Sequence, residues 1–216
     1  MSTLYIAAAF GLGLLLCAAL YGVFFLLDKY LPKKVTGTLG GFLFPLLSIL
    51  PTIPIMINSG RPFLNFAGAA DSTSWIFGLV TVGAVLLTLA GREGKKKLSV
   101  SQTIFSGLEG AAMEIPQRLM MQSFLLLLLT KWNVPSPDTW SCFVNALVWC
   151  CGIAIQSAIT RKQDRDQSFD MVASFLFSFG IGIVYLRSEL ILIPMVCHFA
   201  ERILSQILQN RRVKRV

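Results

Sequence analysis

Charged residues are scarce in this chain, and their scarcity excludes an ordinary soluble domain. Only 14% of the 216 residues are Asp, Glu, Lys or Arg, whereas 55% are hydrophobic. Soluble domains carry about 25% charged residues, which keep their surfaces hydrated. We therefore expect the apolar residues to face lipid, and residues 1–216 to form a single integral membrane domain.

Histidine is nearly absent too, with one copy at position 198. Catalytic zinc sites normally use three protein ligands, so a lone histidine disfavours zinc, and we expect no metal and no other cofactor. No nucleophile motif accompanies His198, so a serine hydrolase fits poorly. The five cysteines show no CxxC spacing and lie in or beside apolar segments, which argues against a disulfide framework.

The apolar residues form seven long segments, each near the ~20 residues with which an α-helix crosses ~30 Å of hydrocarbon. The sequence predicts an all-α, polytopic membrane helix bundle of about seven transmembrane helices. Their expected positions are 4–27, 38–57, 73–91, 112–130, 140–160, 169–186 and 189–208. Pro45, Pro51 and Pro54 predict a kinked or broken second helix. The more polar stretch 98–111 predicts an interfacial helix leading into the fourth.

Lysine and arginine alternate along the loops. They cluster after the first, third, fifth and seventh segments, whereas the second, fourth and sixth are each followed by one basic residue. Because cytoplasmic loops are enriched in Lys and Arg, this alternation predicts an outside N-terminus and a basic cytoplasmic tail at 209–216. The net charge of +8 lies in these loops and the tail. We therefore expect anionic lipid as a partner, and no nucleic acid.

Two basic residues, Arg118 and Arg202, fall inside the predicted spans, and Glu114, His198 and Glu201 lie with them. A charge at the centre of a membrane helix costs roughly 2.5–3.5 kcal/mol, so such residues are usually paired or functional. Two pairs stand four positions apart on one helical face, and the topology brings both to the inner half of the bilayer. A purely structural ion pair is the competing interpretation. For Glu201 and Arg202 alone, snorkelling towards the interface is the simpler one.

Two segments of the C-terminal half carry a family resemblance. Residues 110–118 (GAAMEIPQR) resemble an EExxxR motif, and residues 177–187 (FSFGIGIVYLR) with 193–198 (IPMVCH) resemble a Gly-rich helix followed by a P-x-x-x-H helix. Both are motifs of the CAAX-protease and bacteriocin-processing (CPBP, or Abi) family of intramembrane proteases, over a core at about 98–208. The resemblance implies peptide-bond hydrolysis, in which a Glu and two His activate water and an Asn stabilises the oxyanion.

The chain departs from the family pattern at its catalytic positions. Met113 stands where the family has its first Glu, and Arg202 stands where it has the Asn. The second motif, FxxxH, lacks its histidine in both available registers, Trp149–Ile153 and Gly152–Gln156. For Asn145 in the same helix, we expect an interhelical hydrogen bond.

By this resemblance, Glu114, Arg118 and His198 are the candidate catalytic residues, with Gln156 and Arg202 as possible supporting residues. Glu114 matches the second Glu of the motif. It points about 100° away from the first one, and Arg118 stabilises its charged form. We expect His198 to lack a carboxylate that orients it.

Three functions remain open from the sequence. The chain could be an active glutamic-type intramembrane peptidase that uses Glu114 as a substitute base. It could be a relative with weakened or lost activity that binds a membrane-embedded or membrane-anchored protein or peptide, or serves as a processing accessory. Alternatively, it could be a small transporter or structural bundle protein outside the family. The missing catalytic residues favour the second.

Overall fold

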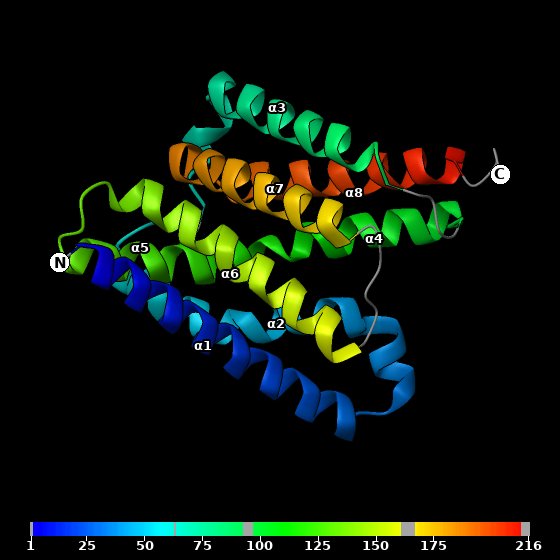
Figure 1. Cartoon of the computed structure of the whole chain (residues 1–216), viewed down its shortest axis with the longest axis horizontal. Coiled ribbons are helices and arrows are strands. Elements are labelled where there is room, and N and C mark those ends of the chain that lie inside the picture. Colours follow the sequence, from blue (N-terminus) through cyan, green and yellow to red (C-terminus); the bar gives the residue numbers. More distant parts are fainter. Residues whose placement is uncertain (1, 63, 93–96, 161–166, 213–216) are drawn as a thin grey trace.

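The computed structural model describes residues 2–62, 64–92, 97–160 and 167–212. Its elements are α1 (Ser2–Tyr30), α2 (Lys33–Ser59), the 3-10 helix η1 (Phe66–Ala70), α3 (Ser72–Leu89), α4 (Val100–Ala112), the π-helix η2 (Ile115–Gln122), α5 (Ser123–Lys131), α6 (Pro137–Thr160), α7 (Gln167–Ser188) and α8 (Leu192–Arg212). Figure 1 shows α4 continuing into α5, so the described part contains seven long helical units. The prediction of an all-α membrane bundle is confirmed.

Five of these helices are long and apolar enough to cross a membrane by themselves. They are Ser2–Leu27, Gly40–Ser59, Ser72–Leu89, Pro137–Ile155 and Gln167–Ser188. The other two units are the continuous helix α4–η2–α5 and α8. They carry the charged residues singled out from the sequence, which explains their lower hydropathy, because a polar site inside a bundle interrupts the apolar run.

The second helix is kinked and not broken. It runs without interruption from Lys33 to Ser59, yet Figure 1 shows its first turns at a steep angle to the rest. A proline such as Pro45 removes one backbone hydrogen bond and its ring clashes with the carbonyl four residues earlier, which bends a helix. Ser48 and Thr52 add side-chain bonds to the carbonyls of Pro45 and Ser48, which also favours bending.

The predicted interfacial segment 98–111 forms α4, which packs along α8. The approach is close: a Cβ atom on Gly107 would lie 2.8 Å from Phe199 Cδ2, and one on Gly110 would lie 2.7 Å from Arg202 Cγ. Helix α4 is therefore a packed member of the bundle. Its place at a membrane interface stays a prediction.

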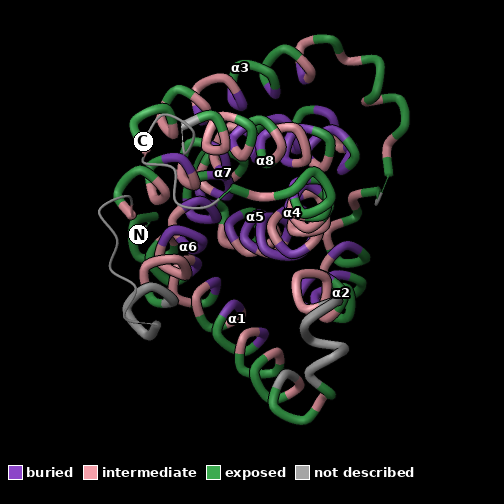
Figure 2. The backbone as a smooth tube through the Cα atoms, turned by 90° about the vertical axis from the view of Figure 1, so that its right-hand side faces the viewer, coloured by how far each residue is buried: buried purple, intermediate pink, exposed green. Residues whose placement is uncertain are grey.

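The burial pattern is that of a bundle with a lipid-facing surface. Figure 2 shows buried positions on the inward sides of the helices and exposed positions on the outward sides, especially along α1 and α3. The exposed positions include large apolar side chains, such as Leu4, Leu15, Leu79 and Leu87. Because lipid tails solvate apolar side chains, an integral membrane protein can leave them uncovered.

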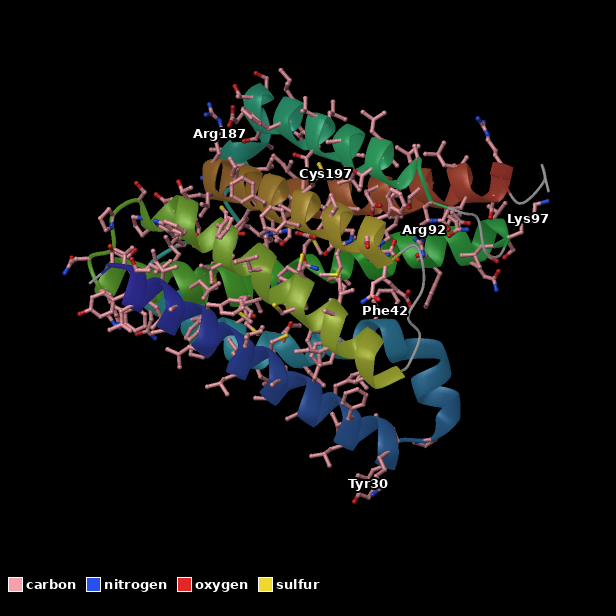
Figure 3. The ribbon with its side chains drawn as sticks, in the orientation of Figure 1. Tyr30, Phe42, Arg92, Lys97, Arg187 and Cys197 are labelled. Atoms are coloured by element: carbon pink, nitrogen blue, oxygen red, sulfur yellow. The ribbon has the colours of Figure 1, made fainter. Side chains whose placement is uncertain are left out.

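The described basic residues that follow the third predicted span lie at the same end of the bundle as the C-terminal end of α8. Figure 3 places Arg92 and Lys97 at one end and Arg187 at the other, and Figure 1 places the C-terminus with the former. Residues 93–96, 161–166 and 213–216, which hold many of the other basic positions, lie outside the described part. Helix α8 continues to Arg212, so half of the predicted tail is helical. This placement agrees with the predicted topology, while the side of the membrane stays a prediction.

Cysteine labelling tests that topology. In a variant without native cysteines, single cysteines at Lys33, Lys96, Lys162 and Arg215 should resist a membrane-impermeant maleimide until the cells are permeabilised. Cysteines at Arg61 and Arg187 are the matched controls, and they should be labelled in intact cells. Labelling of any two of the four test positions from outside would refute the orientation.

Candidate functional site

A cavity of about 520 Å³ lies among the helices, towards the end that carries Arg92. Its wall comes from one residue of α1, the end of α3, α4, the start of η2, the second half of α6, the start of α7 and most of α8. The walls contributed by α4, η2 and α8 are rich in polar groups, whereas α3 and α6 add apolar ones. The cavity is therefore more polar than most ligand pockets, although its volume lies within their usual range of roughly 300–1,000 Å³.

The π-helix η2 positions Glu114 and Arg118, the first two residues of a polar cluster that also contains His198 and Arg202. Pro116 has no N–H and clashes with the carbonyl four residues earlier, so the α-helical bonding is interrupted here. The chain adopts a π-helix over Ile115–Gln122, an arrangement found mostly at functional sites. Within it, Arg118 Nε donates to Glu114 Oε2 at 2.8 Å, and both side chains are fully buried.

Helix α8 supplies the second half of the cluster. His198 Nδ1 lies 2.6 Å from Glu114 Oε1, so one carboxylate joins Arg118 and His198. Arg202 Nε donates to His198 Nε2 over 3.4 Å. In a neutral imidazole, Nε2 is then the acceptor and Nδ1–H donates to Glu114. The expectation that His198 lacks an orienting carboxylate is therefore wrong, because Glu114 fixes its ring and its tautomer.

Arg118 also ties the site to α7. Its Nη1 donates to the backbone oxygen of Ser178 at 2.9 Å and to Gln122 Oε1 at 3.1 Å, and Gln122 Nε2 donates to the backbone oxygen of Gly182 at 2.9 Å. A fully buried guanidinium must use most of its donors within the protein, and this one does. The structural interpretation of the Glu114–Arg118 pair therefore has direct support.

The two adjacent residues at the start of η2 face different surroundings. Met113 and Gln117 line the cavity, whereas Glu114 is fully buried and absent from the cavity wall. Met113 holds the position that matches the first Glu of the family motif. The side chain that would meet a water in the cavity is thus a thioether, which cannot accept a proton at neutral pH.

Helix α6 also presents no imidazole to the cavity. Trp149 and Ile153 both line it, which favours the Trp149–Ile153 register of the second motif, with Ile153 in place of the histidine. The side chain of Gln156, a possible supporting residue, lies outside the described part of the chain. Asn145 accepts from Trp149 Nε1 at 3.0 Å within its own helix, so the expected interhelical bond is absent from the described residues.

Glu201 and Arg202 line the cavity as well, while the interpretation that they snorkel towards the interface stays a prediction. Glu201 is buried, and its Oε2 lies 3.7 Å from Arg202 Nε. The Arg202 side chain is half exposed. Among the described residues, no group of three or more His, Cys, Asp or Glu side chains is placed to hold a metal ion.

The structure brings together Glu114, Arg118, His198 and Arg202, the polar residues that the sequence singled out. That they form a catalytic site stays a prediction. The sequence analysis missed Gln117 and Gln122. A signal for both existed, because they are polar residues in an apolar segment, and Gln122 stands one turn after Arg118 on the same face.

These features define a class: a polytopic membrane protein with a buried Glu–Arg–His cluster beside an internal cavity. The family model described as type II CAAX prenyl endopeptidase Rce1-like matches residues 100–204. Over this segment the chain is similar to that family, and the resemblance to the CPBP intramembrane proteases is confirmed. The matched range contains η2, α6, α7 and the cluster residues of α8. No curated protein and no solved structure matched the chain.

Proposed function

We propose that this CAAX-protease-like membrane protein has weakened or lost peptidase activity, and that its cavity binds a membrane-embedded or membrane-anchored peptide or protein. One observation carries the proposal: Met113, and not a carboxylate, meets the cavity where the family motif has its first Glu. Glu114 cannot substitute from its present position, because it is buried in its bonds to Arg118 and His198.

The remaining family roles are also poorly filled. Ile153 cannot act as a base or bind a proton, and Arg202 brings a positive charge where a neutral amide is expected. The cavity itself remains, with walls that could hold a peptide. Loss of the reacting groups with retention of the space favours binding over turnover. The family match over residues 100–204 disfavours the transporter alternative.

A variant peptidase is the second candidate, and the Glu114–His198 contact favours it. A carboxylate that holds Nδ1–H leaves Nε2 as a base on the cavity side, as in hydrolytic triads. The contact from Arg202 Nε argues against this role, because it engages the lone pair of Nε2 that a base would need.

A cleavage assay separates the two candidates. Purified protein is incubated with prenylated and unprenylated peptides, and products are followed by mass spectrometry, with His198→Ala as the control. We expect wild-type turnover to be no higher than that of His198→Ala. Robust wild-type turnover that disappears in both His198→Ala and Glu114→Gln would make the protein a variant protease.

A further inference from the structure

Two buried polar side chains of α6 and α7 carry atoms that still need a hydrogen-bond partner. Asn145 of α6 is 0% exposed and Ser178 of α7 is 1% exposed. Asn145 Nδ2 and Ser178 Oγ are without a partner in the part of the chain that the structure describes. Leaving a buried polar atom unpaired is costly, and in native proteins such atoms nearly always bond to protein or to ordered water.

The packing of α6 on α7 places these two side chains opposite each other. The helices are antiparallel neighbours (Figure 1), and each presents a row of residues spaced three or four positions apart. The rows are Cys142, Asn145 and Trp149 on α6, and Gly182, Ser178 and Ser174 on α7. At one end, a Cβ atom on Gly182 would lie 3.2 Å from Cys142 Sγ. At the other end, Trp149 and Ser174 both line the cavity. The middle members of the rows therefore meet one helical turn beyond the cavity wall.

Neighbouring bonds show which atom of each side chain is available. Asn145 Oδ1 accepts from Trp149 Nε1 at 3.0 Å, which fixes the amide so that Nδ2 is the remaining donor. A serine inside a helix can donate to the carbonyl of the preceding turn, as Ser188 of α7 does to Val184 at 2.8 Å. Ser178 makes no such bond among the described residues, so its hydroxyl is available to a partner outside its own helix.

We propose that one ordered water molecule binds between α6 and α7, where it accepts from Asn145 Nδ2 and bonds to Ser178 Oγ. Two polar partners meet the minimum that a buried water requires. The π-helix η2 closes the third side of this site, because Arg118 Nη1 donates to the backbone oxygen of Ser178 at 2.9 Å. The water therefore joins α6 to the hydrogen-bonded network of Arg118.

A neutral ligand fits this site better than an ion. Asn145 Nδ2 is a donor and the neighbouring charge of Arg118 is positive, so a cation would be repelled. An anion would add a buried negative charge, although Arg118 is already paired with Glu114 at 2.8 Å. Water carries no charge and both donates and accepts. The assignment does not depend on the proposed function of the cavity, and its failure would leave that function standing.

An experimental structure of the full-length protein that resolves ordered water tests the site directly. We expect one density peak within hydrogen-bond distance, roughly 2.7–3.2 Å, of both Asn145 Nδ2 and Ser178 Oγ. A direct bond between the two side chains, or a peak that contacts only one of them, would overturn the proposal. An anomalous signal at this position after a bromide soak would identify an anion site and would overturn it as well.

A double-mutant cycle on the protein in detergent tests the shared water in solution. Ser178→Ala should lower the melting temperature by roughly 2–4 °C, the shift for about one hydrogen bond in a chain of this size. Asn145→Ala should lower it further, because it also breaks the bond to Trp149. The double variant should lose less than the sum of the two, because both side chains bond to the same water.

Ser188→Ala is the matched control for this cycle. Ser188 is an equally buried serine of α7, but its hydroxyl bonds within its own helix and it lies ten positions, or about 15 Å, from Ser178. Its effect should therefore add to that of Asn145→Ala. If the effects of Ser178→Ala and Asn145→Ala add in the same way, the two side chains do not share a water and the proposal is wrong.

Discussion

Replacing Arg118 with leucine should destabilise the folded protein by about 3–5 kcal/mol, the cost of breaking a buried ion pair from one side. Arg118 is fully buried and donates to the side chains of Glu114, Gln117 and Gln122 and to the backbone of Ser178. Its loss therefore leaves four acceptors short of a donor. The carboxylate of Glu114 would keep only His198 as a partner. Unfolding in mixed micelles, followed by circular dichroism, measures the effect.

Two further variants test whether the destabilisation comes from breaking the buried ion pair. Arg187→Leu removes an arginine that also pairs with an aspartate, Asp71, at 2.8 Å, but its side chain is half exposed. Exposed pairs contribute about 1 kcal/mol or less, so this control should have a small effect. The double variant Glu114→Leu/Arg118→Leu should recover part of the loss, because no charge is left unpaired. Equal costs for Arg118→Leu and Arg187→Leu would mean that the buried cluster adds no more stability than the exposed pair.

The all-α architecture was predictable from the sequence because a lipid bilayer restricts the length and the backbone hydrogen bonding of the segments that cross it. A span needs about 20 apolar residues, and every backbone polar group must be satisfied within the helix. The meeting of Glu114 with Arg118 follows from their spacing on one helix. Counting the spans also predicted that His198 lies at a similar depth to Glu114, and the structure places the two side chains in contact.

The fine geometry was not predictable, because it depends on packing between helices far apart in the chain. Glu114 and His198 are 84 residues apart, and a local pattern cannot show which atom of the carboxylate meets which ring nitrogen. The close approach at Gly110, which places α8 against α4, has no local signature either. Pro116 interrupts the α-helical bonding, and the π-helix found there is one of several responses to a proline, so it had no unique signature in the sequence.

Met113 and Glu114 are neighbours in sequence but have different surroundings, and this difference favours the loss of peptidase activity. Part of the difference could be predicted from the sequence, and part is seen only in the structure. The sequence placed Glu114 about 100° away from the motif position around the helix. The structure adds that Met113 faces the cavity and that Glu114 is held in bonds on both carboxylate oxygens. A carboxylate in that position orients a histidine and anchors an arginine, which are supporting roles. Position 113, which faces the cavity, therefore carries no acid–base group, although the helices and hydrogen bonds around it are intact.

An intact scaffold predicts that peptidase activity can be restored. The triple variant Met113→Glu/Ile153→His/Arg202→Asn should hydrolyse a prenylated peptide at least about 10²-fold faster than wild type. General acid–base catalysis contributes typically 10²–10⁴-fold and one oxyanion donor about 10²–10³-fold. All three positions line the cavity, so the new groups would face one another, while the buried bonds among Glu114, Arg118 and His198 stay as they are. Product formation is measured by mass spectrometry.

Two matched triples test whether the position of each group matters. The first carries Gln in place of Glu at position 113, which preserves size but removes the base, and it should stay near the wild-type rate. The second carries Gln156→His in place of Ile153→His and so places the imidazole in the alternative register. Because Ile153 lines the cavity, the second should be slower than the Met113→Glu/Ile153→His/Arg202→Asn variant. A folded triple that binds peptide but gains no turnover over its Gln-bearing counterpart would show that the cavity lost more than these three groups.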